Sequence, residues 1–312
     1  LYGDFAGQDV TFVVLVCYPT TADNPRPDYP LYQTDRVVPH MQTGAEAPLF
    51  ADAAARYPVA AFSHGFLDSP INSDHYILAL SVLASYGYVV IAPFHGDARF
   101  SNLRIDSLDT AIAVATHLEN FTALQALRAL SISAALDLVL AHPQWRDHLD
   151  ETQIGGFGAS MGGETMLLLA GAGLTTSYFD LGSSWTPVTR DSRIKAAFGY
   201  VPYFGQPILP AFGRDQHGLD GINLPFLGLS GTADTTAPII EAQIGMSRLT
   251  GPRRLVALSG VTHGFNDAAT NDIFTWLLTF LGAEVRGDLE AISRYSTMGS
   301  VAGGVDDSVV LY

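Results

Sequence analysis

The chain has 312 residues, of which 48% are hydrophobic and 15% are charged. This composition can build a sizeable core and excludes a disordered chain. Acidic residues number 31 and basic residues 16, so the formal net charge is −15. Because an acidic surface repels phosphate backbones and anionic lipids, neither nucleic acid nor stable membrane insertion is expected. The sequence does not predict an oligomeric state.

The single cysteine, Cys17, excludes an intramolecular disulfide and a four-cysteine zinc site. Its apolar neighbours predict that it packs in a strand. No run reaches the roughly 18 apolar residues that suggest a membrane span. The sequence begins at Leu1 and not at Met, which is compatible with removal of a signal peptide. We therefore expect a secreted or periplasmic protein.

Short apolar runs alternate with helical patterns, which predicts one α/β domain over residues 1–312 with a mainly parallel sheet. In chain order, the predicted strands are Val10–Val16, Val59–Phe62, Tyr88–Ala92, Gln153–Phe157, Ile194–Tyr200, Leu224–Leu229, Arg254–Leu258 and Asp307–Tyr312. The predicted helices are Ser73–Ser85, capped by Ser73 or Asp74, then Asn120–Ala141, Met161–Ala170 and Ile273–Leu281. Pro19–Arg56, Thr175–Arg193 and Pro202–Gly221 are predicted to be irregular, and Gly282–Tyr312 is an ambiguous tail.

The sharpest motif is the pentapeptide at 158–162, which reads Gly-Ala-Ser-Met-Gly. It matches G-x-S-x-G, in which a serine stands exposed on a strained turn between a strand and a helix. Small neighbours are needed because side chains beside that turn would clash. The predicted strand before the motif and helix after it supply the expected context, so Ser160 is the candidate nucleophile.

A serine nucleophile needs a histidine base, which in turn needs a carboxylate to orient it. Of the two histidines downstream of Ser160, His263 follows a predicted strand directly, whereas His217 lies in an irregular segment. Asp234 also follows a predicted strand. Functional residues of open α/β sheets gather at such carboxyl ends. The sequence therefore predicts a catalytic triad of Ser160, Asp234 and His263.

An oxyanion hole requires two N–H groups aimed at the developing negative oxygen. One is expected from Met161, which follows the nucleophile, and the other from Phe66, where Gly65 would let the backbone turn. His64 is interpreted as a structural anchor of this loop and Asp97 as a structural residue. Phe66, Trp185, Tyr203 and Phe265 are candidates for substrate contact. No metal site and no cofactor are predicted, because Asp306 and Asp307 supply too few oxygens for calcium.

Four motifs together resemble the α/β-hydrolase superfamily over about residues 55–282. They are the His64-Gly65-Phe66 turn, the Ser160 turn, and the segments 231–234 and 262–264. Within it, Tyr18-Pro19, the segment 62–65 and Tyr86–Val90 make the chain similar to the dienelactone-hydrolase-like group, which includes platelet-activating-factor acetylhydrolase relatives and cutinases. The resemblance implies an α/β-hydrolase fold with a mostly parallel eight-stranded sheet flanked by helices, with irregular cap segments after strands 5 and 6.

The resemblance also implies a serine hydrolase that cleaves carboxylic esters through an acyl-enzyme and has no cofactor. The aromatic residues and the acidic surface favour neutral hydrophobic esters, small or polymeric, polyesters included. The chain departs from secreted cutinases because it has no cysteine pair for a disulfide, and Ala159 stands where many relatives have His. A carbon–carbon hydrolase of β-diketones, as in cleavage of oxidised polyvinyl alcohol, would use the same triad. A non-catalytic binding module on the same scaffold is the alternative of another class.

Overall fold

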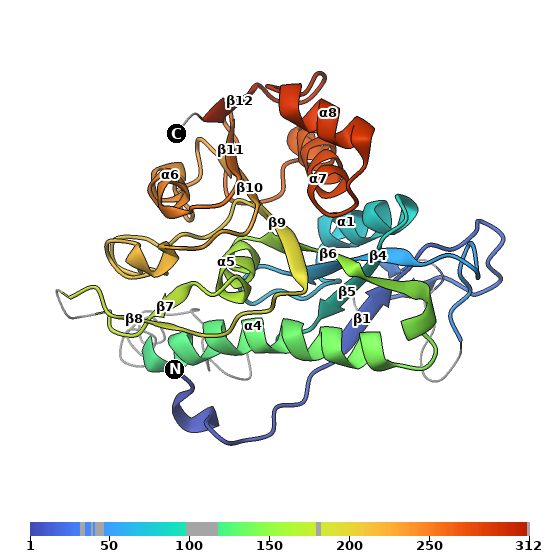
Figure 1. The fold of residues 1–312 in the computed structure, drawn as a ribbon, viewed down its shortest axis with the longest axis horizontal. Coiled ribbons are helices and arrows are strands. Elements are labelled where there is room, and N and C mark those ends of the chain that lie inside the picture. Colours follow the sequence, from blue (N-terminus) through green and yellow to red (C-terminus); the bar gives the residue numbers. More distant parts are fainter. Residues whose placement is uncertain (32–34, 39, 41–46, 98–117, 179–181, 311–312) are drawn as a thin grey trace.

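A computed structural model describes residues 1–31, 35–38, 40, 47–97, 118–178 and 182–310. Its centre is an eight-stranded sheet in the order β1-β5-β4-β6-β9-β10-β11-β12 (Figure 1). These strands are β1 (Val14–Cys17), β4 (Tyr57–Ser63), β5 (Val89–Pro93), β6 (Leu149–Ala159), β9 (Ile194–Tyr200), β10 (Phe226–Gly231), β11 (Arg253–Leu258) and β12 (Asp307–Val310). The architecture is α/β with a mainly parallel sheet, as the alternating pattern predicts.

The strands from β5 to β11 across the sheet run parallel, while β1 and β12 are antiparallel additions at its two edges. The strands β4, β5, β9 and β10 are buried along almost their whole length, as expected for a sheet covered on both faces. Parallel pairing also brings the carboxyl ends of β4, β6, β9, β10 and β11 to one edge of the sheet. That edge is where the predicted catalytic residues lie.

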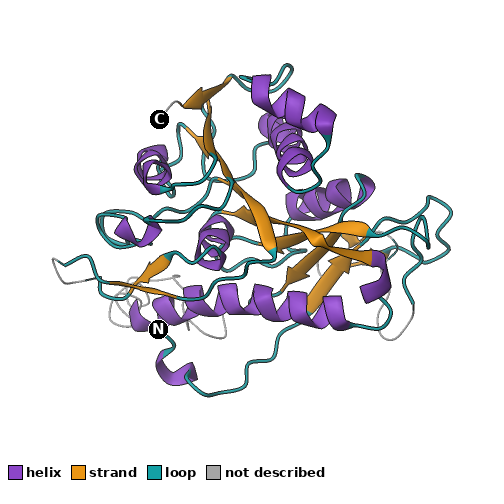
Figure 2. Cartoon of the chain, viewed as in Figure 1, coloured by secondary structure: helices purple, strands orange, loops and turns teal. Residues whose placement is uncertain are grey.

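Helices cover both faces of the sheet (Figure 2). They are α1 (Asp74–Ser85), α4 (Leu118–Ala141), α5 (Met161–Leu169), α6 (Ile239–Arg248), α7 (Thr270–Glu284) and α8 (Leu289–Thr297). Side chains of α4, α5 and α6 share one buried apolar cluster, and those of α1 and α7 share another on the opposite face. The helix α8 lies on α7 (Figure 1). The Ser73 side chain accepts a hydrogen bond from the His75 N–H, so Ser73 caps α1 as predicted.

Two short hairpins lie outside the central sheet. One pairs β2 (Tyr29–Pro30) with β3 (Val37–Val38), and the other pairs β7 (Gly173–Thr175) with β8 (Trp185–Pro187). Short 3-10 helices occur at Gly3–Phe5, Arg146–His148, His217–Leu219 and Asp267–Ala269. Residues 32–34, 39 and 41–46 of the Pro19–Arg56 segment, and the last two residues of the predicted C-terminal strand, lie outside the described residues.

Several predicted boundaries need correction. The first strand starts at Val14 and not at Val10, because pairing with β5 begins opposite Pro93. The segment Thr175–Arg193 is not wholly irregular, since it contains β8. The ambiguous tail after Gly282 contains α8 and the edge strand β12, and α6 was not predicted at all. Cys17 lies at the end of β1, where burial raises the pKa of its thiol to about 12.

One helix among the described residues, α4, is long and apolar enough over Asn120–Ala141 to cross a membrane by length and composition alone. The sequence criterion of an unbroken apolar run missed it, because polar residues such as Gln125 and Arg128 interrupt the segment. In the structure, most of this stretch is buried against α5 and the strands β4 and β5. It therefore packs as a core helix.

Candidate active site

The three predicted triad residues come from separate strand ends and lie together. Ser160 follows β6, Asp234 follows β10 and His263 follows β11. The His263 Nε2 is 2.8 Å from the Ser160 Oγ, and the His263 Nδ1 is 2.8 Å from an Asp234 carboxylate oxygen. Because the carboxylate can only accept at Nδ1, it fixes the tautomer that leaves Nε2 free to accept the serine proton.

The Ser160 backbone has φ 54° and ψ −118°, a conformation that a residue with a Cβ rarely adopts. It is held by hydrogen bonds from the Ser160 N–H to the Tyr200 carbonyl (2.9 Å) and from the Tyr203 N–H to the Ser160 carbonyl (3.0 Å). The surrounding glycines are needed for space. A Cβ on Gly158 would collide with the backbone at Gly162, and one on Gly162 would collide with the Ser63 carbonyl.

Asp234 is positioned by its own turn. Its side chain is fully buried, and the carboxylate oxygen that does not face His263 accepts hydrogen bonds from the N–H groups of Thr236 and Ala237, each at 2.8 Å. Such backbone donors stabilise the ionised carboxylate in a site that water does not reach. These hydrogen bonds hold the Asp234 carboxylate in the orientation that faces the His263 Nδ1.

The loop carrying His263 is fastened to β9 and to α1. The Tyr200 hydroxyl donates to the Gly264 carbonyl at 2.9 Å. The ring of Phe265 packs against the rings of Tyr200, Tyr76 and His75, with centroid distances of 4.5, 5.5 and 5.3 Å. Tyr200 also accepts a hydrogen bond from the Ser160 N–H through its own carbonyl. It therefore contacts both the turn that carries Ser160 and the loop that carries His263.

The two residues predicted to supply the oxyanion hole, Phe66 and Met161, pack in the same part of the structure. The side chains of Phe66 and Met161 belong to one small apolar cluster, whose other members are Phe121, Leu124, Tyr178 and Leu209. Within the described part of the chain, neither the Phe66 N–H nor the Met161 N–H donates to a protein acceptor. Gly65 serves a different purpose from the one predicted. It does not adopt a positive φ, and a Cβ there would stand 2.7 Å from Asp68 and 2.9 Å from the Tyr76 hydroxyl.

The other aromatic candidates for substrate contact are packed differently. The Tyr203 ring is buried in the core and its hydroxyl donates to the Leu209 carbonyl at 2.6 Å. Phe265 is held among the three rings described above. Trp185, on β8, is 40% exposed and covers Gly173 and Gly213. Among the described residues, only Phe66 of these candidates shares a cluster with Met161.

His64 and Asp97, which the sequence suggested to be structural, are both buried near the site. His217 is not the histidine bonded to Ser160; it is half exposed, and its ring contacts the Asp220 carboxylate at 2.5 Å and Arg248 at 2.9 Å. Among the described residues, no group of three or more His, Cys, Asp or Glu side chains is arranged to hold a metal ion.

Two buried charged residues near the site were not predicted. Glu164, in the first turn of α5, is fully buried. One of its oxygens accepts from the Gln125 amide at 2.5 Å, and the other has no hydrogen-bond partner in the described structure. Burial raises the pKa of this carboxyl to about 8, although Arg128 and Gln125 act in the opposite direction. Arg128, on α4, is the second. The clearest sequence signal for it is an arginine inside an otherwise apolar helical pattern.

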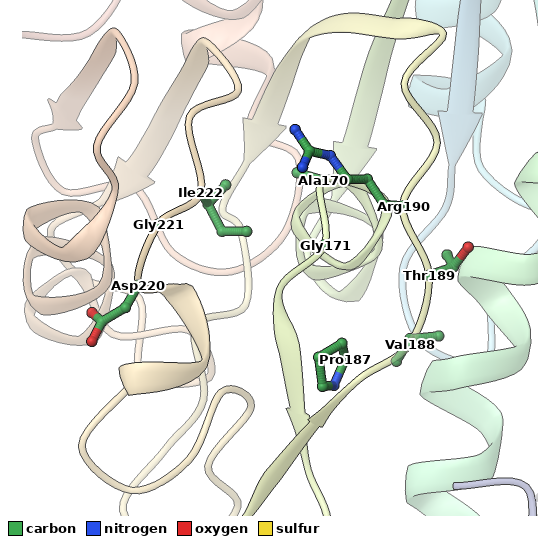
Figure 3. Close-up of a pocket in the computed structure, with 9 residues that line it drawn as sticks. All are labelled: Ala170, Gly171, Pro187, Val188, Thr189, Arg190, Asp220, Gly221 and Ile222. Atoms are coloured by element: carbon green, nitrogen blue, oxygen red, sulfur yellow. The ribbon is translucent and has the colours of Figure 1, made fainter.

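A pocket of about 430 Å³ lies elsewhere in the molecule (Figure 3). Its lining comes from the end of α5, the segment after β8 and the turn before β10, and includes Ala170, Arg190 and Ile222. Since α5 starts beside Ser160 and ends at Leu169, the pocket lies at the opposite end of that helix from the triad.

A scan against family models found no match for this chain, and a search of curated proteins found none either. The resemblance to α/β-hydrolases therefore rests on the motifs in the sequence and on the arrangement of the residues that they contain.

Proposed function

We propose that this protein is a serine hydrolase of the α/β-hydrolase type that cleaves carboxylic esters through an acyl-enzyme. The observation that carries the proposal is the continuous chain of hydrogen bonds from Ser160 through His263 to the buried Asp234. A partly exposed serine on a strained turn, a histidine between that serine and a carboxylate, and the burial of the carboxylate are the parts of nucleophilic acyl transfer.

In the proposed mechanism, the Ser160 Oγ attacks the acyl carbon while the His263 Nε2 takes the serine proton. The N–H groups of Phe66 and Met161 stabilise the tetrahedral oxyanion, and the imidazolium then protonates the leaving alkoxide. A water molecule, deprotonated by His263, attacks the acyl carbon; the bond from that carbon to the Ser160 Oγ breaks, the imidazolium returns the proton to the Oγ, and the acid is released. Asp234 accepts the hydrogen bond from the His263 Nδ1 throughout and so orients the imidazole and stabilises the imidazolium.

The apolar cluster around Phe66 and Met161 supports neutral hydrophobic esters as the substrate class. It joins the side chains of Phe66 and Met161, the residues whose N–H groups we propose for the oxyanion hole, to the rings of Phe121 and Tyr178, and the Phe66 and Phe121 centroids are 5.7 Å apart. An acyl chain whose carbonyl oxygen occupies that hole would therefore meet an apolar surface.

The proposal is tested by replacing Ser160 with alanine. We expect Ser160→Ala to fold, because alanine keeps the Cβ of serine and needs no more space, and to lose ester hydrolysis by about 10³-fold or more. A fluorophosphonate probe should label the unaltered protein and not the variant. A folded Ser160→Ala protein that still hydrolyses a nitrophenyl ester would refute the assignment. A β-diketone assayed in parallel distinguishes ester from carbon–carbon cleavage, and an unlabelled wild-type protein favours a binding module.

A further inference from the structure

Arg128 reaches from α4 into the loop that follows β4. Its side chain and that of Asp97 are each only 1% exposed, and they form an ion pair with 2.6 Å between an Arg128 Nη and an Asp97 oxygen. A buried ion pair of this kind gives little net stability over an apolar pair of the same volume, because both charges lose their hydration. What this ion pair provides and an apolar pair could not is a set of hydrogen bonds to nearby groups.

Most of those hydrogen bonds go to residues 63–67, and one further bond runs from the Arg128 Nε to the Thr165 hydroxyl at 3.4 Å. Arg128 donates to the Ser63 hydroxyl (3.3 Å), to the His64 carbonyl and to the Gly65 carbonyl (3.4 Å). The Asp97 oxygen that pairs with Arg128 also accepts the Leu67 N–H at 2.9 Å. The ion pair thus contacts the backbone on both sides of Phe66, while the Phe66 N–H donates to no protein acceptor among the described residues.

Two buried histidines complete the network as neutral groups. Burial, together with the nearby Arg128 charge, lowers the pKa of both His64 and His95 well below the usual value. The His95 N–H donates to the His64 Nε2, so the His64 Nδ1 carries the proton and donates to the Gly65 carbonyl at 2.8 Å. The Gly65 carbonyl is therefore held by both His64 and Arg128.

Planarity of the peptide bond connects this carbonyl to the oxyanion hole. The Gly65 carbonyl and the Phe66 N–H belong to the same trans peptide group and point in opposite directions. Fixing the oxygen toward the buried Arg128 and His64 therefore fixes the direction of the N–H away from them. Hydrogen bonds to the carbonyl oxygen also polarise the peptide, which makes its N–H a stronger donor.

We propose that Arg128 and Asp97 are positioning residues of the reaction, which orient and polarise the Gly65–Phe66 peptide so that its N–H serves the oxyanion hole. This inference rests on the proposed function, since it gives a role to that peptide only in acyl transfer. It adds a requirement that the triad alone does not contain. Arg128 acts on the carbonyl oxygen of this peptide, whereas the substrate would be bound by its N–H.

The test compares Arg128→Lys and Arg128→Met with the unaltered protein on a neutral nitrophenyl ester. Lysine keeps the charge but not the fork of donors. We expect kcat to fall about 10-fold in Arg128→Lys and about 100-fold in Arg128→Met, with KM changed less than about threefold, since misplacing one group by about 1 Å costs roughly 10² in rate. Binding of the intact ester, measured in a Ser160→Ala background, should be unchanged by either substitution.

The matched control is Arg193→Met. Arg193 also forms hydrogen-bonded ion pairs, with Asp191 and Asp137, and also contacts α4 through the Ser133 carbonyl. The Arg193→Met substitution should lower the thermal stability of the protein without lowering kcat. Folded Arg128 variants that keep kcat within about twofold would overturn the positioning role. If Arg128→Met does not fold, Arg128→Lys and Asp97→Asn decide the question by the same criterion.

The outcomes separate this inference from the proposed function. If the unaltered protein neither hydrolyses esters nor reacts with a fluorophosphonate at Ser160, both proposals fall together. If it does both, and the Arg128 and Asp97 variants do so at the same rate, only the positioning role falls. A loss of kcat with unchanged ground-state binding supports the inference, whereas a loss of binding with unchanged kcat contradicts it.

Discussion

At the scale of single residues, two residues about one helical turn apart at the start of α5 carry a local energetic cost. Ser160 has a strained backbone, and Glu164 has a buried carboxyl. The Ser160 backbone occupies a region of φ and ψ that costs about 1–3 kcal/mol. Glu164 lies beneath it in the core with one oxygen that has no partner. Both features lie at the start of the helix that presents the candidate nucleophile, where positioning matters more than local stability.

Glu164 is expected to make the stability of the protein depend on pH. In the folded state burial raises the pKa of this carboxyl to about 8, whereas in the unfolded chain it has the ordinary value of 4.5 for a glutamate. The unfolded state therefore binds fewer protons between these values, and the free energy of unfolding falls as the pH rises from about 5 to 8, by at most roughly 1.4 kcal/mol per pH unit. Below about pH 4.5 the carboxyl is protonated in both states, so Glu164 no longer makes the free energy of unfolding depend on pH.

Glu164→Gln should remove that dependence. At pH 5 we expect the variant to match the unaltered protein, and at pH 8 to be more stable by an amount on the order of 1 kcal/mol or more. Urea titrations at the two pH values measure the difference. The exposed Glu151→Gln is the control, and its difference from wild type should be the same at both pH values. Parallel stability curves for Glu164→Gln would contradict the burial argument.

Ser160, Asp234 and His263 could be predicted because each lies in a short motif after an apolar run. The order of such motifs along the chain can be read directly from the sequence. Arg128 and Asp97 carry no such motif. Asp97, which follows β5, is separated from its partner by 31 residues, and only the packing of α4 against β5 brings the two together. The partners of a buried charge are a tertiary property, so single-sequence patterns did not predict them.

At the scale of elements, β9 joins the parts of the site. Its last residue, Tyr200, binds the Ser160 N–H through its carbonyl and the Gly264 carbonyl through its hydroxyl. We expect Tyr200→Phe to cost about 0.5–1.5 kcal/mol of stability, the usual contribution of one hydrogen bond. We also expect a several-fold loss of kcat, because the His263 loop loses a contact that sets its distance from Ser160.

Tyr57→Phe provides the comparison for that prediction. The Tyr57 hydroxyl also donates to a backbone carbonyl, that of Asp52 at 3.0 Å, but it lies at the start of β4. Thermal melts and initial rates measured on both variants decide the matter. If Tyr200→Phe and Tyr57→Phe lose stability alike and neither loses activity, the hydroxyl of Tyr200 is structural only.

The inner strands could be predicted because each is a short apolar run between helical patterns, and Ile194–Tyr200 was predicted with the bounds that the structure shows. The elements that were not predicted are not marked by a pattern of apolar residues. In α6, Ile240 and Ile244 are exposed, so its apolar spacing does not mark a buried face. The strand β8 contains only three residues and exists because it pairs with β7. Pairing partners, unlike hydropathy, cannot be read from one segment.

At the scale of the whole molecule, the net charge of −15 affects which substrates arrive at the site. A neutral ester should have a higher kcat/KM than a matched ester that carries a carboxylate, because long-range repulsion slows the encounter of the anion. Raising the ionic strength shortens the Debye length and should narrow this gap. Steady-state rates for both esters at low and high salt test the prediction. A preference for the anionic ester at low salt would contradict it.

The antiparallel strand β12 has a consequence for solubility. It covers the outer edge of β11, whose residues Leu255–Leu258 pair with Val310–Asp307. An uncovered apolar strand is a template for pairing with other chains, whereas the present edge begins with the acidic pair Asp306-Asp307. Removing residues 305–312 should therefore cause self-association, detected by light scattering. Added salt should accelerate it by screening the repulsion between acidic copies, and a truncated protein that remains monodisperse would contradict this role.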